Sequence, residues 1–393
     1  MRVGPMVRQL CSPWSSAIHE SQLRAVMAVT QAIASGGRLS VSAIGRAVEA
    51  PAFVKHRIKR VDRLLSNPRM HRDRWLYFEA LAAQLIGTCE QPVVLLDWTK
   101  TPSDFYALVA AVPGDGRALT IYEEVHPEKR LANPRVEARF LRNLRRVLPD
   151  GCRPIVVTDA GFRGPFLHQL QALGWDFVGR LRSNTQMRPA EGTEWMTIPE
   201  IYATATPRAR KLGSFRLYRT RKQLLANLVL VGPRRYPRKH PWRGRSPYRG
   251  GLCPKTINGA KEPWLLVTSL DLTSKAVVNI YAKRMQIEEI FRDTKNSRFG
   301  WCLRHARSRS AARLTILLLL AAIAMLAVIL VGRAAEVAGV RARYQANTET
   351  RRVLSLFMLG LQILRDPHRP PLAAVVPAGL RYLRSIQNLA DTP

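Results

Sequence analysis

The chain has 393 residues, 47% of them hydrophobic, so it can bury the cores of two or three domains and is not disordered throughout. Its 62 Lys and Arg against 28 Asp and Glu give a net charge of +34, far more than solubility requires. A polyanion is therefore the expected partner, and nucleic acid is favoured over a membrane surface because the basic residues are spread along the whole chain among Trp and Tyr.

The five cysteines predict neither a zinc cluster nor a disulfide framework, because they lie far apart in the sequence. They are Cys11, Cys89, Cys152, Cys253 and Cys302. This usage fits a reducing cytoplasm. The N-terminal stretch has no apolar core of signal-peptide length, so we expect no export.

Residues 1–90 are predicted to form a helical DNA-binding domain, since apolar residues recur at helical spacing and strand signals are few. Between Lys55 and Arg74 there are eight Lys or Arg and only two Asp. Such a run is either a solvated helix face or a DNA-contacting surface, and the net charge of the chain favours the second. The local signals are the N-cap candidates Ser40 and Ser42 and the helix breakers Pro51 and Pro68.

Residues 91–183 are predicted to be the first part of an α/β core. Three strand-like runs are followed by a helix, a strand, a helix and a strand, an order that belongs to the ribonuclease-H-like mixed sheet. The expected strands are PVVLLDWTK, DFYALVAAVP, RALTIYEEV, PIVVTDAGF and WDFVGRLRS, and the expected helices are PRVEARFLRNLRRVLP and PFLHQLQALG.

Residues 184–272 read as a β-rich insertion with a basic loop. The short strand-like runs SFRLYRTR, LLANLVLVG and WLLVTSLDL surround the loop PRRYPRKHPWRGRSPYRGG. The loop is either a disordered linker or a base-stacking surface, and Tyr236, Trp242 and Tyr248 among the cations favour the second.

Residues 273–393 are predicted to be helical. Within them, the segment Leu314 to Gly332 carries no charge and is bounded by Arg313 and Arg333. Its length would suffice for a membrane span. Because it is solitary, rich in Ala and flanked by Arg at both ends, a helix buried in a large core is the favoured interpretation, and the span stays as the alternative.

Two Asp residues end buried strand-like runs. Asp97 follows VVLL and Asp159 follows IVVT. A carboxylate in such a place needs a compensating partner, and two of them on neighbouring strands could hold Mg²⁺. Each could equally be an ordinary turn residue, and Asp271 has the same local pattern.

A helix is expected across Tyr281 to Gly300. On it, Tyr281, Arg284, Glu288 and Lys295 fall within about 60° of one another, whereas Glu289 points roughly 100° away from Glu288. The apolar residues of the adjoining sector would press the helix against the sheet and bring Glu288 towards the strand ends. The alternative is a surface helix with an ordinary ion pair between Arg284 and Glu288.

The spacing Y-x2-R-x3-E-x6-K, which these four residues meet, resembles the signature of bacterial insertion-sequence transposases of the DDE superfamily. The family carries a β-rich insertion between its second Asp and its Glu. Similar stretches are KHRIKRVDRLLSN, VVLLDWTK, VTDAGF, EPWLLVTSL, NIYAKRMQIEEIFRD and LRHARS. The likeness covers most of residues 20–365.

The resemblance implies a catalytic triad of Asp97, Asp159 and Glu288 that binds two divalent ions, Mg²⁺ with Mn²⁺ as a substitute. Tyr281, Arg284 and Lys295 match positions that contact transposon-end phosphates, for which Arg and Lys are chemically suited. The corresponding role of Trp264 is to stack on a flipped base, with a half-buried strand Trp as the alternative. Asp271 has no counterpart and is expected to be structural.

The implied activity is cut-and-paste transposition. The protein would bind the terminal inverted repeats of its element on double-stranded DNA, nick each end, form and reopen hairpin ends, and join them to target DNA. Such chemistry implies a homodimer on paired ends, working in the bacterial cytoplasm at the nucleoid, with no membrane. The alternatives are a catalytically inactive DNA-binding regulator, a ribonuclease-H-like nuclease and a membrane-anchored protein.

Overall fold

The computed structural model describes residues 3–14, 16–36, 38–182, 184–220, 222–233 and 262–368. The predicted stacking residues Tyr236, Trp242 and Tyr248 lie outside this part of the chain. The polypeptide is divided into two compact units. Unit 1 comprises Met1–Ile155 and Lys283–Thr392, and unit 2 comprises Val156–Ala282.

Unit 1 contains most of the helices. They are α1 (Val3–Leu10), α2 (Glu20–Gly36), α3 (Val41–Ala47), α4 (Val54–Ser66), α5 (Pro68–Ile86), α6 (Pro134–Val147), α11 (Met285–Lys295), α12 (Ala311–Val337) and α13 (Leu356–Arg365), with short 3₁₀ helices at Ser12–Trp14, Glu128–Arg130, Leu303–His305 and Val340–Tyr344. Of the two N-cap candidates, Ser40 is the cap, since its hydroxyl accepts a hydrogen bond from the Ala43 amide of α3 at 3.3 Å. Pro68 is the first residue of α5, where its missing N–H costs nothing.

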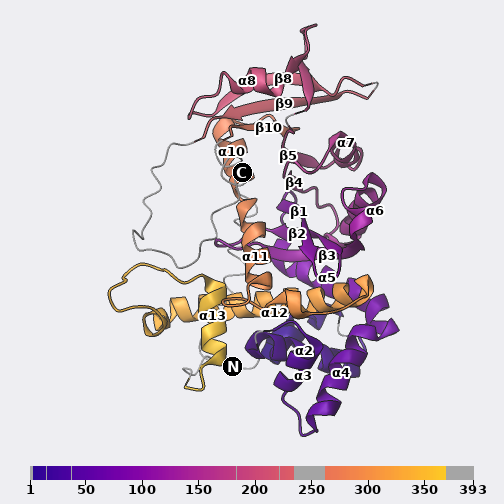
Figure 1. Cartoon of the computed structure of the whole chain (residues 1–393), viewed down its shortest axis with the longest axis vertical. Helices are drawn as coiled ribbons and strands as arrows, with labels where there is room; N and C mark the ends of the chain where they lie inside the picture. The colour runs from indigo at the N-terminus through magenta and orange to yellow at the C-terminus, as the bar shows by residue number, and fades with distance from the viewer. Residues whose placement is uncertain are drawn as a thin grey trace. The chain divides into compact units, whose positions relative to one another are not determined.

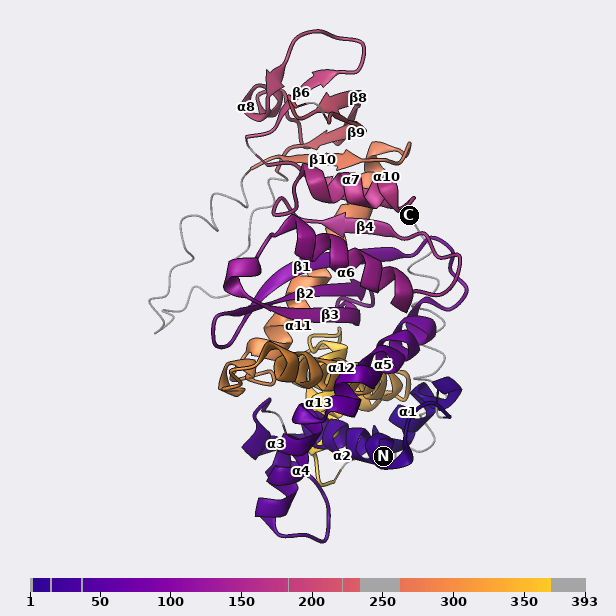
Figure 2. The ribbon, with the colours of Figure 1, turned by 90° about the vertical axis from the view of Figure 1, so that its right-hand side faces the viewer.

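Three antiparallel strands form the sheet of unit 1, in the order β3 (Leu119–Pro127), β2 (Phe105–Val112) and β1 (Val93–Thr101). Helix α6 lies on one face of these strands and α11 on the other (Figures 1 and 2). Trp98 faces α6, because its indole donates a hydrogen bond to Glu137 at 3.2 Å. Side chains alternate along a strand, so Asp97 and Thr99 face α11.

Helix α12 is the apolar segment for which a membrane span was the alternative. By length and composition it could cross a membrane, but 94% of its apolar window is buried inside the protein. It packs against β3, α2, α5 and α13, and Figure 1 shows it between the three strands and helices α2 to α4. Helix α12 therefore has the burial of a core helix, which is the interpretation that the sequence favoured.

Unit 2 is built on strands in the order β4-β5-β10-β9-β8-β6-β7. The bounds are β4 (Ile155–Thr158, of which Ile155 is counted in unit 1), β5 (Asp176–Arg180), β6 (Gln186–Pro189), β7 (Met196–Thr197), β8 (Arg210–Leu217), β9 (Leu224–Val231) and β10 (Trp264–Thr268), with helices α7 (Gly164–Ala172), α8 (Ile198–Tyr202) and α10 (Ser274–Ala282). Helix α7 lies on one face of this sheet and α10 on the other (Figures 1 and 2).

The predicted order of three strands, helix, strand, helix and strand is confirmed by β1, β2, β3, α6, β4, α7 and β5. This mixed α/β arrangement is consistent with a ribonuclease-H-like core. The three strands expected between residues 214 and 272 are present as β8, β9 and β10. The short elements β6, β7 and α8 were not predicted, because two to five residues are too few to show a period.

The single helix expected across Tyr281 to Gly300 is wrong. Helix α10 ends at Ala282 and α11 begins at Met285. The amides of Gln286 and Ile287 bond to carbonyls three residues back, at 3.0 and 3.1 Å, which tightens the turn and interrupts the regular ladder. The angular positions of residues around one helix axis can therefore be compared within α11, but Tyr281 lies on a different helix.

Glu123 of β3 carries a buried carboxyl group, since the residue is only 6% exposed, and burial raises its pKa from 4.5 to about 8. The folded protein keeps this proton up to about pH 8, whereas the unfolded chain loses it near pH 4.5, so stability falls as the pH rises through that window. We expect Glu123→Gln to be more stable than the wild type by about 1–3 kcal/mol at about pH 8, and this gain to shrink towards pH 5. Urea unfolding at several pH values measures the difference.

Glu128→Gln is the matched control, because it makes the same Glu-to-Gln change at an exposed position. It should give no such pH-dependent difference. A gain for Glu123→Gln that stays constant between pH 5 and 8 would contradict the protonated state of the buried Glu123.

Candidate active site

Two of the three predicted catalytic carboxylates meet in unit 1. Arg284, at the start of α11, lies between Asp97 of β1 and Glu288 of α11. Its guanidinium nitrogens are 3.6 Å from an Asp97 carboxylate oxygen and 2.6 Å from a Glu288 carboxylate oxygen. The side chains of Arg284 and Asp97 are 13% and 15% exposed, and that of Glu288 is 41% exposed. The site thus combines a shielded cation with two carboxylates, one of which is open to solvent.

Lys295 brings a second cation to the same face of β1. Its ammonium group donates a hydrogen bond to the Thr99 hydroxyl at 2.5 Å, two residues beyond Asp97. Burial lowers the pKa of Lys295, while the nearby Asp97 carboxylate raises it. Arg284 and Lys295 therefore both act electrostatically on Asp97, one from each end of α11.

Glu289 points away from this cluster. Its carboxylate pairs with Arg292 at 2.7 Å and with Arg117 at 3.4 Å. Arg117 also binds Asp293 at 2.6 Å, and burial raises the pKa of Asp293 although Arg117 opposes the shift. The neighbouring Glu residues therefore differ as predicted, because Glu289 belongs to the ion pairs that hold α11 in place.

The loop between β2 and β3 fixes the position of α11, and sequence reasoning missed it. The Gly114 amide donates to the Gln286 side-chain oxygen at 2.8 Å, and the Ala118 amide donates to the Gln286 carbonyl at 3.3 Å. Arg117 adds its ion pairs from the same loop. No sequence signal marks these contacts, since they join residues about 170 positions apart without any periodic pattern.

Asp159 directly follows β4 in unit 2. One of its carboxylate oxygens accepts a hydrogen bond from the Gly161 amide at 2.8 Å. A Cβ on Gly161 would lie 2.8 Å from that same oxygen, so a larger residue there would displace the Asp159 carboxylate. The local bonding is that of a turn Asp, the alternative that the sequence left open. The Ala160 carbonyl accepts a hydrogen bond from the Arg182 side chain at 2.7 Å.

Trp264 and Tyr281 pack together in unit 2. Their ring centroids are 5.0 Å apart and the planes are inclined by 71°. Tyr281 is only 4% exposed, whereas Trp264, the first residue of β10, is half-buried. The buried Tyr281 ring thus packs against the half-buried Trp264 ring and helps to fix its position. Asp271 pairs with Lys211, in keeping with the structural role expected for it.

Within either unit, the described residues contain no group of three or more His, Cys, Asp or Glu that could hold a metal ion. Unit 1 supplies Asp97 and Glu288, and unit 2 supplies Asp159. The carboxylates of the Arg284 cluster are nevertheless hard oxygen donors, which Mg²⁺ and Mn²⁺ prefer. Both carboxylates also pair with the same arginine, so their combined negative charge requires a compensating positive charge. The donor set therefore fits a divalent cation.

The family model of the transposase DDE domain matches residues 88–326, which is more than half of the chain. The chain belongs to this family. The resemblance to DDE transposases is thereby confirmed at the level of the superfamily, and the protein is a transposase, an enzyme whose substrate is DNA. Enzymes of this superfamily generally use divalent metal ions. A search of curated proteins finds no significant match.

Proposed function

We propose that this transposase binds the terminal inverted repeats of its own insertion sequence, cleaves the DNA at each end and joins the ends to target DNA. The observation that carries the proposal is the pairing of Asp97 and Glu288 around Arg284, within the range that matches the family. A cut-and-paste route through hairpin ends follows from the resemblance of the Y-R-E-K positions.

Asp97, Asp159 and Glu288 are the proposed ligands of two divalent ions, Mg²⁺ or Mn²⁺. Such ions supply the Lewis-acid chemistry of phosphoryl transfer. The residues of unit 1 orient the carboxylates, because Arg284 forms ion pairs with both of them and Lys295 donates a hydrogen bond to Thr99, two residues beyond Asp97. Catalysis then rests mainly on positioning and on charge at the scissile phosphate.

Arg284 and Lys295 are the proposed contacts of transposon-end phosphates near the cut. Tyr281, which was predicted to share this role, is only 4% exposed and packs against Trp264, so it is not proposed as a phosphate contact. Arg284 has donors enough to serve a carboxylate and a phosphate together, and Lys295 provides a point charge. Trp264 is the proposed platform for a flipped base, and Tyr281 supports this platform through its edge-to-face packing.

Residues 1–90 serve as the DNA-binding domain, 91–183 as the first part of the catalytic core, 184–272 as the insertion, and 273–393 as the helix carrying Glu288 with the C-terminal helices. Two copies act as a homodimer on paired ends, in the cytoplasm at the nucleoid. The basic run on α4, where Lys55, Arg57 and Lys59 begin the helix, supports the first assignment.

Incubation of the purified protein with linear DNA bearing the element's ends and Mg²⁺ or Mn²⁺ tests the proposal. We expect nicks at the outer edge of each inverted repeat, followed by strand-transfer products. Specific binding without nicking would identify a DNA-binding regulator instead. Cutting without any joined product would identify a nuclease of the same fold.

A further inference from the structure

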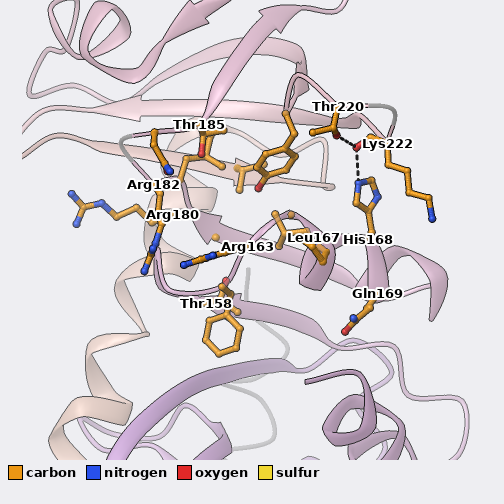
Figure 3. A pocket seen from close by; sticks show the side chains of 18 of the residues that line it. Thr158, Arg163, Leu167, His168, Gln169, Arg180, Arg182, Thr185, Thr220 and Lys222 are labelled. Carbon is orange, nitrogen blue, oxygen red and sulfur yellow. Dashed lines mark hydrogen bonds between the residues drawn. The ribbon is translucent and has the colours of Figure 1, made fainter. Parts of the chain in front are cut away.

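Unit 2 contains a pocket of about 840 Å³ that none of the proposed catalytic residues lines. Its walls are α7, the segment from β5 to β6, and the turn between β8 and β9 (Figure 3). A pocket of this size lies within the range of small-ligand sites, about 300–1,000 Å³. It can therefore admit a nucleotide or a short part of one strand, and it cannot enclose a duplex.

The lining is strongly basic. Five cations contribute to it, namely Arg163, Arg180, Arg182, Arg219 and Lys222, and its described residues include no Asp or Glu. Among the residues that the structure describes, the acid that pairs with this set is Glu262, which binds Arg180 at 3.0 Å from outside the pocket. Figure 3 shows the arginines 163, 180 and 182 at one end and Lys222 with His168 at the other. Charge at both ends suits an extended polyanion better than a single anion.

The shape of the pocket depends on two glycines and a strained tyrosine. A Cβ on Gly164 would lie 2.8 Å from the Tyr218 ring, and one on Gly179 would lie 3.0 Å from the Thr158 hydroxyl oxygen. Tyr218 has a φ of 66°, which is uncommon for a bulky residue. Strain of this kind persists where the surrounding structure enforces it. The aromatic ring is thus held in the wall of a basic pocket, a combination typical of single-strand binding sites.

This pocket lies on the other face of the sheet from Trp264. Val267 lines the pocket and is paired with Gly179, which also lines it. Successive side chains of β10 alternate between faces, so Trp264 points to the face that α10 covers, where it meets Tyr281. The pocket is therefore separate from the proposed flipped-base platform.

One end of the pocket adjoins the turn of Asp159. Thr158, the residue before Asp159, lines the pocket, and Arg182 is bonded to the carbonyl of Ala160, the residue after it. We propose that the pocket binds one DNA strand, with phosphates at the arginines and a base against Tyr218, and leads this strand past Asp159. The inference rests on the proposed function, since it takes Asp159 as part of the site that cuts DNA.

Fluorescence anisotropy with a labelled oligothymidylate and, separately, a labelled duplex bearing the transposon end tests the pocket. We expect the double substitution Arg163→Glu with Lys222→Glu to weaken single-strand binding about tenfold or more, and to reduce the slope of its salt dependence by about two. Duplex binding should stay within about twofold. Arg208→Glu is the matched control, because Arg208 is exposed on unit 2 outside the pocket. It should change single-strand binding by less than about twofold.

Tyr218→Gly provides a test that is independent of charge. Glycine accepts the positive φ, so this substitution removes the ring without adding backbone strain. We expect single-strand binding to weaken about fivefold or more. Unchanged single-strand binding in both variants would overturn the pocket proposal. So would thymidine triphosphate binding as tightly as the oligonucleotide, since the pocket would then be a nucleotide site.

A nicking assay on the same preparations separates this inference from the proposed function. Wild-type protein that nicks transposon ends but binds a single strand independently of the pocket residues refutes the pocket alone. Wild-type protein that binds a single strand through the pocket but never nicks refutes the proposed function and supports the pocket as a single-strand site.

Discussion

Glu288→Gln is expected to reduce nicking of transposon ends by at least about 10²–10³-fold, the loss typical when a charge-stabilising group is removed from an active site. The amide is isosteric with the carboxylate, so α11 should keep its place. What is lost is a negatively charged oxygen donor and the 2.6 Å ion pair with Arg284. A quenched-flow or gel assay of nicking with Mg²⁺ measures the rate, and anisotropy with an end duplex should show binding within a few-fold of wild type.

Glu289→Gln is the control for this prediction, since the same change is made at the adjacent residue. Glu289 pairs with Arg117 and Arg292, whereas Glu288 pairs with Arg284. We expect nicking to stay within about threefold of wild type, together with a loss of stability of about 0.5–1 kcal/mol for a partly shielded ion pair. Equal losses of nicking in the two variants would mean that neither Glu acts as a metal ligand and that both only position α11.

The strands and the core helices could be predicted from the sequence because their signals are periodic. Runs such as VVLLDWTK and the charge-free segment of α12 predict buried elements even when the residues that pack against them are unknown. Asp97 and Glu288 could be selected from strand-end position and helix face, and unit 1 brings them to one arginine. Only the resemblance to DDE transposases indicated a catalytic role for these two residues.

Other features could not be predicted because they depend on contacts distant in sequence. At the break between α10 and α11, two amides bond to the carbonyls of Lys283 and Arg284, three residues back. The spacing of hydrophobic residues does not reveal such a change in the hydrogen-bond pattern. The contacts of Gln286 and Arg117 join α11 to a loop in another part of the chain. The walls of the basic pocket in unit 2 come from α7, the segment from β5 to β6 and the turn between β8 and β9, and its cations look, in sequence, like ordinary surface residues of a basic protein.

Gly360→Ala is expected to destabilise the protein by about 3 kcal/mol or more. Helices α12 and α13 meet through glycine on both sides, so their backbones touch. A Cβ on Gly360 would lie 1.9 Å from the Val328 carbonyl oxygen and 2.9 Å from the Gly332 amide nitrogen, and one on Gly332 would lie 1.9 Å from the Leu356 carbonyl oxygen. Since these neighbours are backbone atoms in buried helices, the helices must separate and lose packing.

Helix propensity alone makes the opposite prediction, because Ala is better than Gly in a helix interior by about 1 kcal/mol. The sign of the change in urea unfolding free energy therefore decides between close packing and propensity. Gly192→Ala is the control, since the three atoms nearest to a Cβ there belong to the Pro189 side chain, at 3.2–3.3 Å, and it should change stability by less than about 1 kcal/mol. A Gly360→Ala variant as stable as the wild type would show that Gly360 of α13 is not in close backbone contact with α12. The contact would then not contribute to holding the core helix behind the sheet that carries Asp97.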